Sequence, residues 1–197
     1  TGLLQTGESK AVKQPKDSST LSLTRMQRLL MRVYNGAWLP ALPLLALFPR
    51  IRQGFGKRMA PDNWVEDEGW QDVWMQSASA GEAYLSWEIA KNMEADTRLS
   101  LLCTTNTSQG MDVLARCREW CRDNNPCLTT NQAWFPFDSP SVMFKALNLV
   151  LPKVVVLLET ELWPGLLMAC AKEEVPVVVI NGRMRPKSLA GYLCLSG

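Results

Sequence analysis

Two unbroken runs of apolar residues, Val154–Leu158 and residues 175–180, constrain the fold of this chain more than any other feature. Runs of strand length without polar alternation are typical of strands buried on both faces, and such strands belong to parallel sheets covered by helices. Shorter apolar runs alternate with helix-like stretches from residue 72 onward. This alternation predicts a doubly wound α/β domain with a parallel sheet. The expected strands cover 72–77, 98–104, 127–134, 153–158 and 175–180, and the expected helices cover 81–94, 108–123, 140–150 and 163–173.

Polar residues follow each expected strand, where the ligand crevice of such a sheet lies. After the first strand, residues 77–82 combine small side chains with Glu82. Small residues let a ligand approach the backbone closely, and free amides at a helix start attract an anion. An ordinary helix start, with a glutamate that complements the helix dipole, has the same pattern. The corresponding segments after the other four strands are 104–110, 135–140, 159–164 and 181–185.

Together these segments place three carboxylates and two arginines on one rim of the sheet: Glu82, Glu159, Glu161, Arg183 and Arg185. Glu159 directly follows a buried strand, so we expect a partly desolvated carboxylate that has a raised pKa or pairs with an arginine such as Arg183. A capping role at a helix start is the alternative interpretation of these glutamates. The hydroxyl-rich segment 104–110 suits the oxygens of a sugar or a phosphate.

The composition excludes several kinds of chemistry. The chain has no histidine, which excludes histidine general bases, Ser-His-Asp triads and histidine-ligated metals. Its six cysteines form no C-x-x-C motif, and Cys117 with Cys121 makes a poor zinc site. We therefore expect no metal and interpret the cysteines as reduced residues of a cytoplasmic protein.

The N-terminal part of the chain differs in charge from the rest. Residues 1–60 contain ten Lys and Arg against two Asp and Glu. Residues 1–20 lack apolar periodicity and are expected to be a disordered lead-in. In residues 21–60, an apolar run at 37–48 lies between cationic flanks, but it is shorter than the roughly 20 residues of a spanning helix. This pattern predicts a helical segment that associates with a membrane interface through residues 21–58.

Two alternatives remain for this segment. It is either a membrane-interface element or a helical hairpin packed on the core of its own domain. A basic surface attracts both anionic membranes and nucleic acids, and we expect the membrane and no nucleic acid. Residues 61–197 then form the α/β domain, without a prediction of oligomeric state. Because the chain begins at Thr1 and stops at Gly197 just after a helix-like stretch, we expect a fragment of a longer protein.

The sequence E-T-E-L-W-P at 159–164 resembles the signature of the 3-deoxy-D-manno-octulosonic acid (Kdo) transferases, which add Kdo to a lipid A precursor. Further blocks agree in order, and the likeness covers about residues 30–197, with 34–58 resembling the family's hydrophobic anchor. These blocks are S-x-G-E at 79–82, T-T-x-T-x-x-G at 104–110, P-x-D-x-P at 136–140 and N-x-R at 181–183.

The resemblance implies an inverting glycosyltransferase of the GT-B class, with two Rossmann-like domains across a cleft. Residues 61–197 match the N-terminal, acceptor-binding domain, and the C-terminal domain that binds the donor CMP-Kdo is absent. Glu82 takes the position of the general base that deprotonates the 6′-hydroxyl of the lipid A precursor. No metal or other cofactor is implied, and the expected location is the cytoplasmic face of an inner membrane, peripheral or monotopic. The implied acceptor contacts are Ser79, Gly81, Thr104, Thr105, Thr107, Glu159, Glu161 and Arg183.

The chain departs from the family pattern at a few positions. Gln76 replaces the usual histidine, and Gly165 replaces the usual asparagine. These changes support an alternative, a divergent paralogue that binds a lipid or glycan without catalysis. A nucleotide-binding oxidoreductase is disfavoured because no G-x-G-x-x-G follows the first strand.

Overall fold

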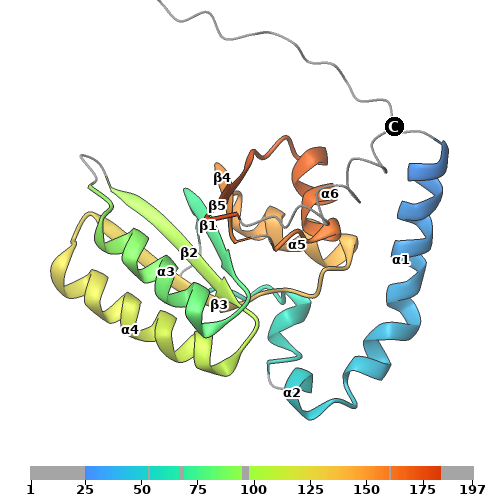
Figure 1. The fold of residues 1–197 in the computed structure, drawn as a ribbon, viewed down its shortest axis with the longest axis horizontal. Coiled ribbons are helices and arrows are strands. Elements are labelled where there is room, and N and C mark those ends of the chain that lie inside the picture. Colours follow the sequence, from blue (N-terminus) through green and yellow to red (C-terminus); the bar gives the residue numbers. More distant parts are fainter. Residues whose placement is uncertain (1–24, 53, 67–68, 95–97, 160, 183–197) are drawn as a thin grey trace, which may run out of the picture.

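The computed structural model describes residues 25–52, 54–66, 69–94, 98–159 and 161–182. A helical N-terminal segment precedes a five-stranded sheet flanked by helices (Figure 1). In chain order the elements are α1 (Arg25–Leu45), α2 (Pro49–Arg52), the 3₁₀ turn η1 (Lys57–Met59), β1 (Val73–Ser77), α3 (Ala80–Lys91), β2 (Leu99–Thr105), α4 (Ser108–Asn124), β3 (Leu128–Trp134), α5 (Pro140–Val150), β4 (Val154–Leu158), α6 (Pro164–Lys172) and β5 (Val177–Ile180).

The sheet is parallel throughout, with the strand order β3-β2-β1-β4-β5. β1 is central, and its Val73 lies opposite Leu101 of β2 and Val154 of β4. The direction in which strands are added reverses between β1 and β4, which makes this position the topological switch point of a doubly wound fold. The predicted α/β, Rossmann-like class is therefore confirmed, in agreement with the N-terminal part of a GT-B glycosyltransferase.

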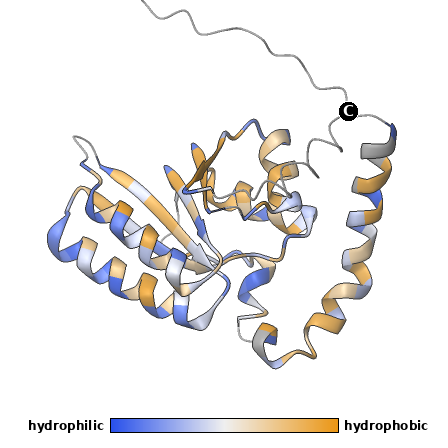
Figure 2. Cartoon of the chain, in the orientation of Figure 1, coloured by the Kyte–Doolittle hydropathy of each residue, from blue (hydrophilic) through white to orange (hydrophobic). Residues whose placement is uncertain are grey.

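Both faces of the sheet are buried. Trp74 and Leu102 belong to a core cluster with residues of α5 and α6, whereas their neighbours Met75 and Cys103 belong to a cluster with residues of α3 and α4. Successive residues of a strand point to opposite faces, so burial of both faces explains why the strands are apolar without alternation. Figure 2 shows the contrast between the hydrophobic strands and the largely hydrophilic surface of α4.

The helix starts are local features of the sequence. The side chains of Ser79 and Thr107 accept hydrogen bonds from the amides of Glu82 and Gly110, and they cap α3 and α4. α5 and α6 each begin at a proline, a residue whose fixed φ suits the first helical turn. Because β1, β2, β3 and β4 each lead into such a helix start, the polar connecting segments after them gather at the carboxyl edge of the sheet.

The N-terminal segment is one long helix followed by short turns. α1 contains Pro40 and Pro43, and the hydroxyl of Tyr34 donates to the backbone carbonyl of Asp138 at 3.0 Å. Trp38 lies against Phe137, with 6.2 Å between ring centroids. None of the helices that the structure describes is both long and apolar enough to cross a membrane. Several large hydrophobic side chains of the segment remain exposed: Leu29, Leu30, Val33, Leu39, Leu44, Leu47 and Phe48.

Candidate active site at the switch point

Three glutamates lie on the two sides of the switch point. Glu82 is on the first turn of α3, which follows β1, while Glu159 and Glu161 directly follow β4. Burial raises the pKa of Glu161, and the negative charges of Glu82 and Glu159 raise it further. Because charge repulsion weakens with distance, the carboxylates of Glu82 and Glu159 lie near enough to Glu161 to influence its ionisation.

The carboxylate of Glu82 is held by two hydrogen bonds. It accepts from the amide of Ala78 at 2.6 Å and from the hydroxyl of Ser79 at 2.9 Å, one donor on each oxygen. The arrangement is a variant of the capping box, and the side chain is only 8% exposed. A carboxylate oxygen has room for a second donor. Glu82 therefore serves the helix start and still has acceptor capacity for a ligand hydroxyl.

Glu159 has an unusual backbone conformation. Its φ of +60° lies in the left-handed region, which is uncommon for a residue with a side chain. Its amide donates to the carbonyl of Ile180 at 2.8 Å and so links the ends of β4 and β5. Arg183, the predicted partner on the next segment, lies outside the described residues.

Thr104 and Thr105 lie in β2 and are fully buried, so the predicted turn at 104–110 begins two residues later than expected. The hydroxyl of Thr104 accepts from the indole of Trp74 at 2.8 Å and donates to the side-chain oxygen of Gln76 at 2.6 Å. Both threonines are therefore buried strand residues and not part of the turn. Thr107, the cap of α4, is the member of this motif that lies in the turn itself.

The two glycines of the predicted motifs differ in what surrounds them. A Cβ on Gly81 would meet only the Ser79 hydroxyl, at 3.8 Å, which is an ordinary contact. A Cβ on Gly165 would lie 2.0 Å from the carbonyl oxygen of Asp138, which no side chain tolerates. The packing thus requires glycine at 165 and would tolerate a Cβ at 81.

Asp138 joins α1, α6 and the end of β3, although sequence reasoning did not include it among the site residues. Its carboxylate accepts from the amides of Gly165 at 2.9 Å and Leu166 at 2.8 Å, and also from the hydroxyl of Tyr34. Burial raises the pKa of Asp138, and these three hydrogen bonds oppose the rise. The P-x-D-x-P block at 136–140 was the available signal.

Arg58 is a second residue that sequence reasoning missed. Its guanidinium donates to the carbonyl and the side-chain oxygen of Asn106, and lies over the rings of Trp134 and Phe137 at 5.1 and 5.7 Å. It lines a cavity of about 310 Å³ with segments that follow β2, β3 and β4. Its sequence context among surface cations gave no sign of this burial.

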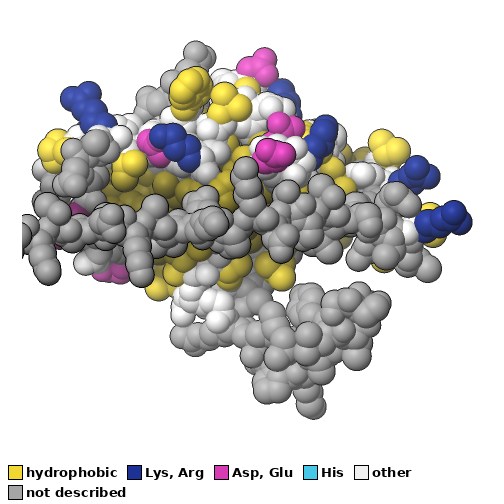
Figure 3. All heavy atoms as spheres, turned by 90° about the horizontal axis from the view of Figure 1, so that it is seen from above, with side chains coloured by type: hydrophobic (Ala, Val, Ile, Leu, Met, Phe, Trp, Pro, Cys, Tyr) yellow, Lys and Arg dark blue, Asp and Glu magenta, His cyan; other side chains and the backbone are white. Residues whose placement is uncertain are grey.

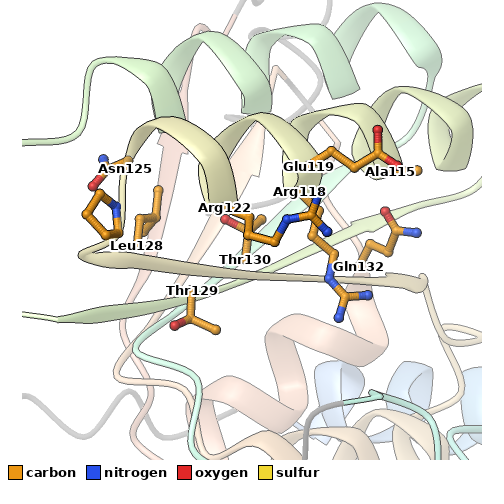
Figure 4. Close-up of a pocket in the computed structure, with 10 residues that line it drawn as sticks. Ala115, Arg118, Glu119, Arg122, Asn125, Leu128, Thr129, Thr130 and Gln132 are labelled. Carbon is orange, nitrogen blue, oxygen red and sulfur yellow. The ribbon is translucent and has the colours of Figure 1, made fainter.

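A cavity of about 670 Å³ lies elsewhere, between α4 and the edge strand β3 (Figure 4). Arg118 and Arg122 extend along it from α4, and each has a carboxylate partner, Glu66 and Asp123 respectively. None of the predicted site residues lines this cavity. Among the described residues, no group of three or more Cys, Asp and Glu side chains is arranged to hold a metal ion.

Residues 50–197 match the sequence profile of the 3-deoxy-D-manno-octulosonic-acid (Kdo) transferases. The chain belongs to this family. It is 26% identical to the 3-deoxy-D-manno-octulosonic acid transferase of Haemophilus influenzae, over 81% of the chain and 38% of that relative. It is 28% identical to the Bordetella pertussis transferase of the same name, over 61% of the chain and 28% of the relative.

A third relative is a bifunctional glycosyltransferase/methyltransferase of Fusobacterium nucleatum. It is 26% identical to this chain, over 73% of the chain and 21% of that protein. The chain thus spans less than two fifths of the length of each of these three relatives. The family assignment and the Rossmann-like sheet place the chain in a glycosyltransferase family.

Proposed function

We propose that this chain is the acceptor-binding part of an inverting glycosyltransferase, which moves Kdo from CMP-Kdo to the 6′-hydroxyl of a lipid A precursor. The observation that supports this proposal most is the set of three glutamates, Glu82, Glu159 and Glu161, at the switch point of a Kdo transferase domain. Ligands of doubly wound sheets bind at that position. A sugar hydroxyl that binds there would meet Glu82 next to Gly81, which adds no side chain of its own.

In this proposal Glu82 is the general base. One of its oxygens accepts the proton of the acceptor hydroxyl, whose oxygen attacks the anomeric carbon of Kdo as the bond to CMP breaks. Two fixed donors on the carboxylate hold it in one orientation, which favours proton transfer along one direction. Ser79, Gly81, Thr107, Glu159, Glu161 and Arg183 would contact the acceptor, with Thr104 and Thr105 supporting the turn from below.

The proposal places the donor in a further domain and requires no metal or cofactor, since the family resemblance implies none. It places residues 21–58 against the membrane surface at the cytoplasmic face. The exposed hydrophobic side chains of α1 support this contact. At the end of the molecule where α1 lies, cationic and hydrophobic side chains stand next to each other (Figure 3).

A non-catalytic lipid-binding or glycan-binding protein is the second candidate function. It is favoured by Gln76, whose side chain is fully buried and bonded to Thr104 in place of the family's usual histidine. Complementation of a strain that lacks Kdo transferase separates the two candidates, because only an enzyme restores growth.

The replacement Glu82→Gln in the full-length protein tests the base. We expect Kdo transfer to fall by about 10²–10⁴-fold, the typical contribution of a positioned general base. Gln keeps an acceptor oxygen for the helix start, so acceptor binding should change less than turnover. Glu88→Gln is the control, because Glu88 is exposed on the same helix and pairs with Lys91. Near-normal turnover of Glu82→Gln would remove Glu82 from this role.

A further inference from the structure

Arg58 is a buried cation without a carboxylate partner among the described residues. It is 9% exposed, and its hydrogen bonds go to the neutral Asn106. Burial lowers the pKa of its guanidinium, without a compensating charge. A buried charge without compensation is costly, so this position favours an anionic ligand.

The carboxylate of Asp138 lines the same cavity but is already occupied. It accepts from Tyr34, Gly165 and Leu166, and no ion pair joins it to Arg58. The Arg58 guanidinium has five N–H groups, and its bonds to Asn106 use two of them. Its Nε–H has no hydrogen-bond partner in the described part of the chain. The cation therefore has donors left, and the neighbouring acid does not take them.

An apolar groove adjoins this cavity. It has a volume of about 540 Å³ and lies between α1 and α6. Tyr34 and Pro164 line both the groove and the Arg58 cavity, so the two spaces adjoin each other at these residues. The groove is lined by Leu30, Val33, Tyr34, Ala37, Pro164 and Met168. A cavity with a buried cation next to an apolar groove matches a molecule with an anionic head and a hydrocarbon tail.

We propose that the two spaces form one binding site for an acylated phosphate, with the phosphate at Arg58 and an acyl chain between α1 and α6. Arg58 supplies forked N–H donors, a geometry suited to phosphate oxygens. The aromatic rings around it exclude water and strengthen the electrostatic attraction. The choice of a lipid ligand rests on the proposed acceptor role, and the site adds to that role a position for the acceptor's phosphate and tail.

Vesicle binding by the chain tests the head of the site. Phosphatidylcholine vesicles are compared with vesicles that also carry either phosphatidic acid or a phosphorylated, acylated glucosamine disaccharide. We expect Arg58→Gln to weaken binding to both anionic vesicles by about tenfold or more, as expected for lost hydrogen bonds to a charged group. Arg122→Gln, which removes an exposed arginine from α4, should bind as the unmodified chain does.

A groove-filling substitution tests the tail independently of any effect of Arg58 on folding. Ala37 is exposed and lines the groove, so Ala37→Trp should fill it without disturbing the core and should weaken binding about tenfold. Leu39→Trp, at a residue that is 81% exposed and outside the groove, is the matched control. Thermal unfolding of each variant shows that the fold is retained.

The outcomes separate the possible lipids and the two proposals. Tighter binding of the disaccharide supports the site and identifies the acceptor, whereas equal binding supports the site and identifies a bilayer phospholipid. The proposed lipid site would be ruled out if folded Arg58→Gln and Ala37→Trp variants bind vesicles as their controls do. If Arg58→Gln does not fold, control-like binding by folded Ala37→Trp alone rules the site out. Since no sugar is transferred in this measurement, a failure of the proposed catalysis would leave its result unchanged.

Discussion

At the scale of single residues, the carboxyl edge of the sheet combines positions that the fold requires with positions that it leaves open. Gly165 is required, because its Cα hydrogen faces the backbone of Asp138. Gly81 is not, because space lies beside it. Glu82 has a part in both respects, since its carboxylate closes a helix start and is the general base of the proposed reaction. Substitutions at the two kinds of position therefore distinguish effects on folding from effects on ligand binding.

Replacing each glycine by alanine tests this distinction. We expect Gly165→Ala to lower the free energy of unfolding by about 1–3 kcal/mol, because the added methyl overpacks against Asp138. We expect Gly81→Ala to leave it unchanged or raise it by up to about 1 kcal/mol, because alanine suits a helix better than glycine. Chemical denaturation measures both, and equal losses would contradict the assigned packing.

At the scale of elements, the helices and strands could be predicted closely from the sequence. The expected strand at 153–158 is β4 (Val154–Leu158), because an unbroken β-branched run has few alternatives inside a domain. The hydroxyl-rich segment was less predictable. Thr104 and Thr105 continue β2, because β-branched residues suit a strand and the Thr104 hydroxyl finds partners in Trp74 and Gln76.

Long-range contacts account for what the sequence pattern could not show. The cations next to Arg58 in the sequence are typical of an exposed segment, yet Arg58 is buried by Asn106 and by the rings of Trp134 and Phe137, which are distant in sequence. The link between Tyr34 and Asp138 spans 104 positions and has no local signature. By contrast, the location of Glu82 and Glu159 at the carboxyl edge could be predicted, because all strands of a parallel sheet end at one edge.

The attachment of α1 to the sheet domain depends on that link. We expect Tyr34→Phe to speed amide hydrogen exchange in α1 about tenfold, because the hydroxyl's bonds to Asp138 are lost. Exchange in β1 and β4 should stay as slow as before, since Asp138 keeps its bonds to α6. Tyr84→Phe, which removes a hydroxyl bonded to Arg116 on α4, is the control. Unchanged exchange in α1 would show that other contacts hold the helix.

At the scale of the whole molecule, the fold brings three glutamates near one another, Glu82 from the segment after β1 and Glu159 and Glu161 from the segment after β4. Because the folded state raises the pKa of Glu161, it binds more protons than the unfolded chain above about pH 4.5. The contribution of this group therefore lowers stability as pH rises from that value through the raised pKa. Asp138, whose pKa burial also raises, acts in the same direction.

The variant Glu161→Gln tests this pH dependence. We expect it to be more stable than the unmodified chain at neutral pH, and the difference should shrink as pH falls towards about 4.5. The measurement is the free energy of unfolding across this pH range. Glu173→Gln, at the C-terminal end of α6, serves as the control. A stability difference that grows on acidification would have the wrong sign for a raised pKa.

At Glu159, the left-handed backbone and the proposed use of the carboxylate favour different residues. Glycine would adopt the φ of +60° without strain and would suit the backbone better. The substitution Glu159→Gly, which would relieve the backbone strain, would therefore also remove a carboxylate from the proposed acceptor site. If Glu159 contacts the acceptor as proposed, selection for stability and selection for activity favour different amino acids at this position.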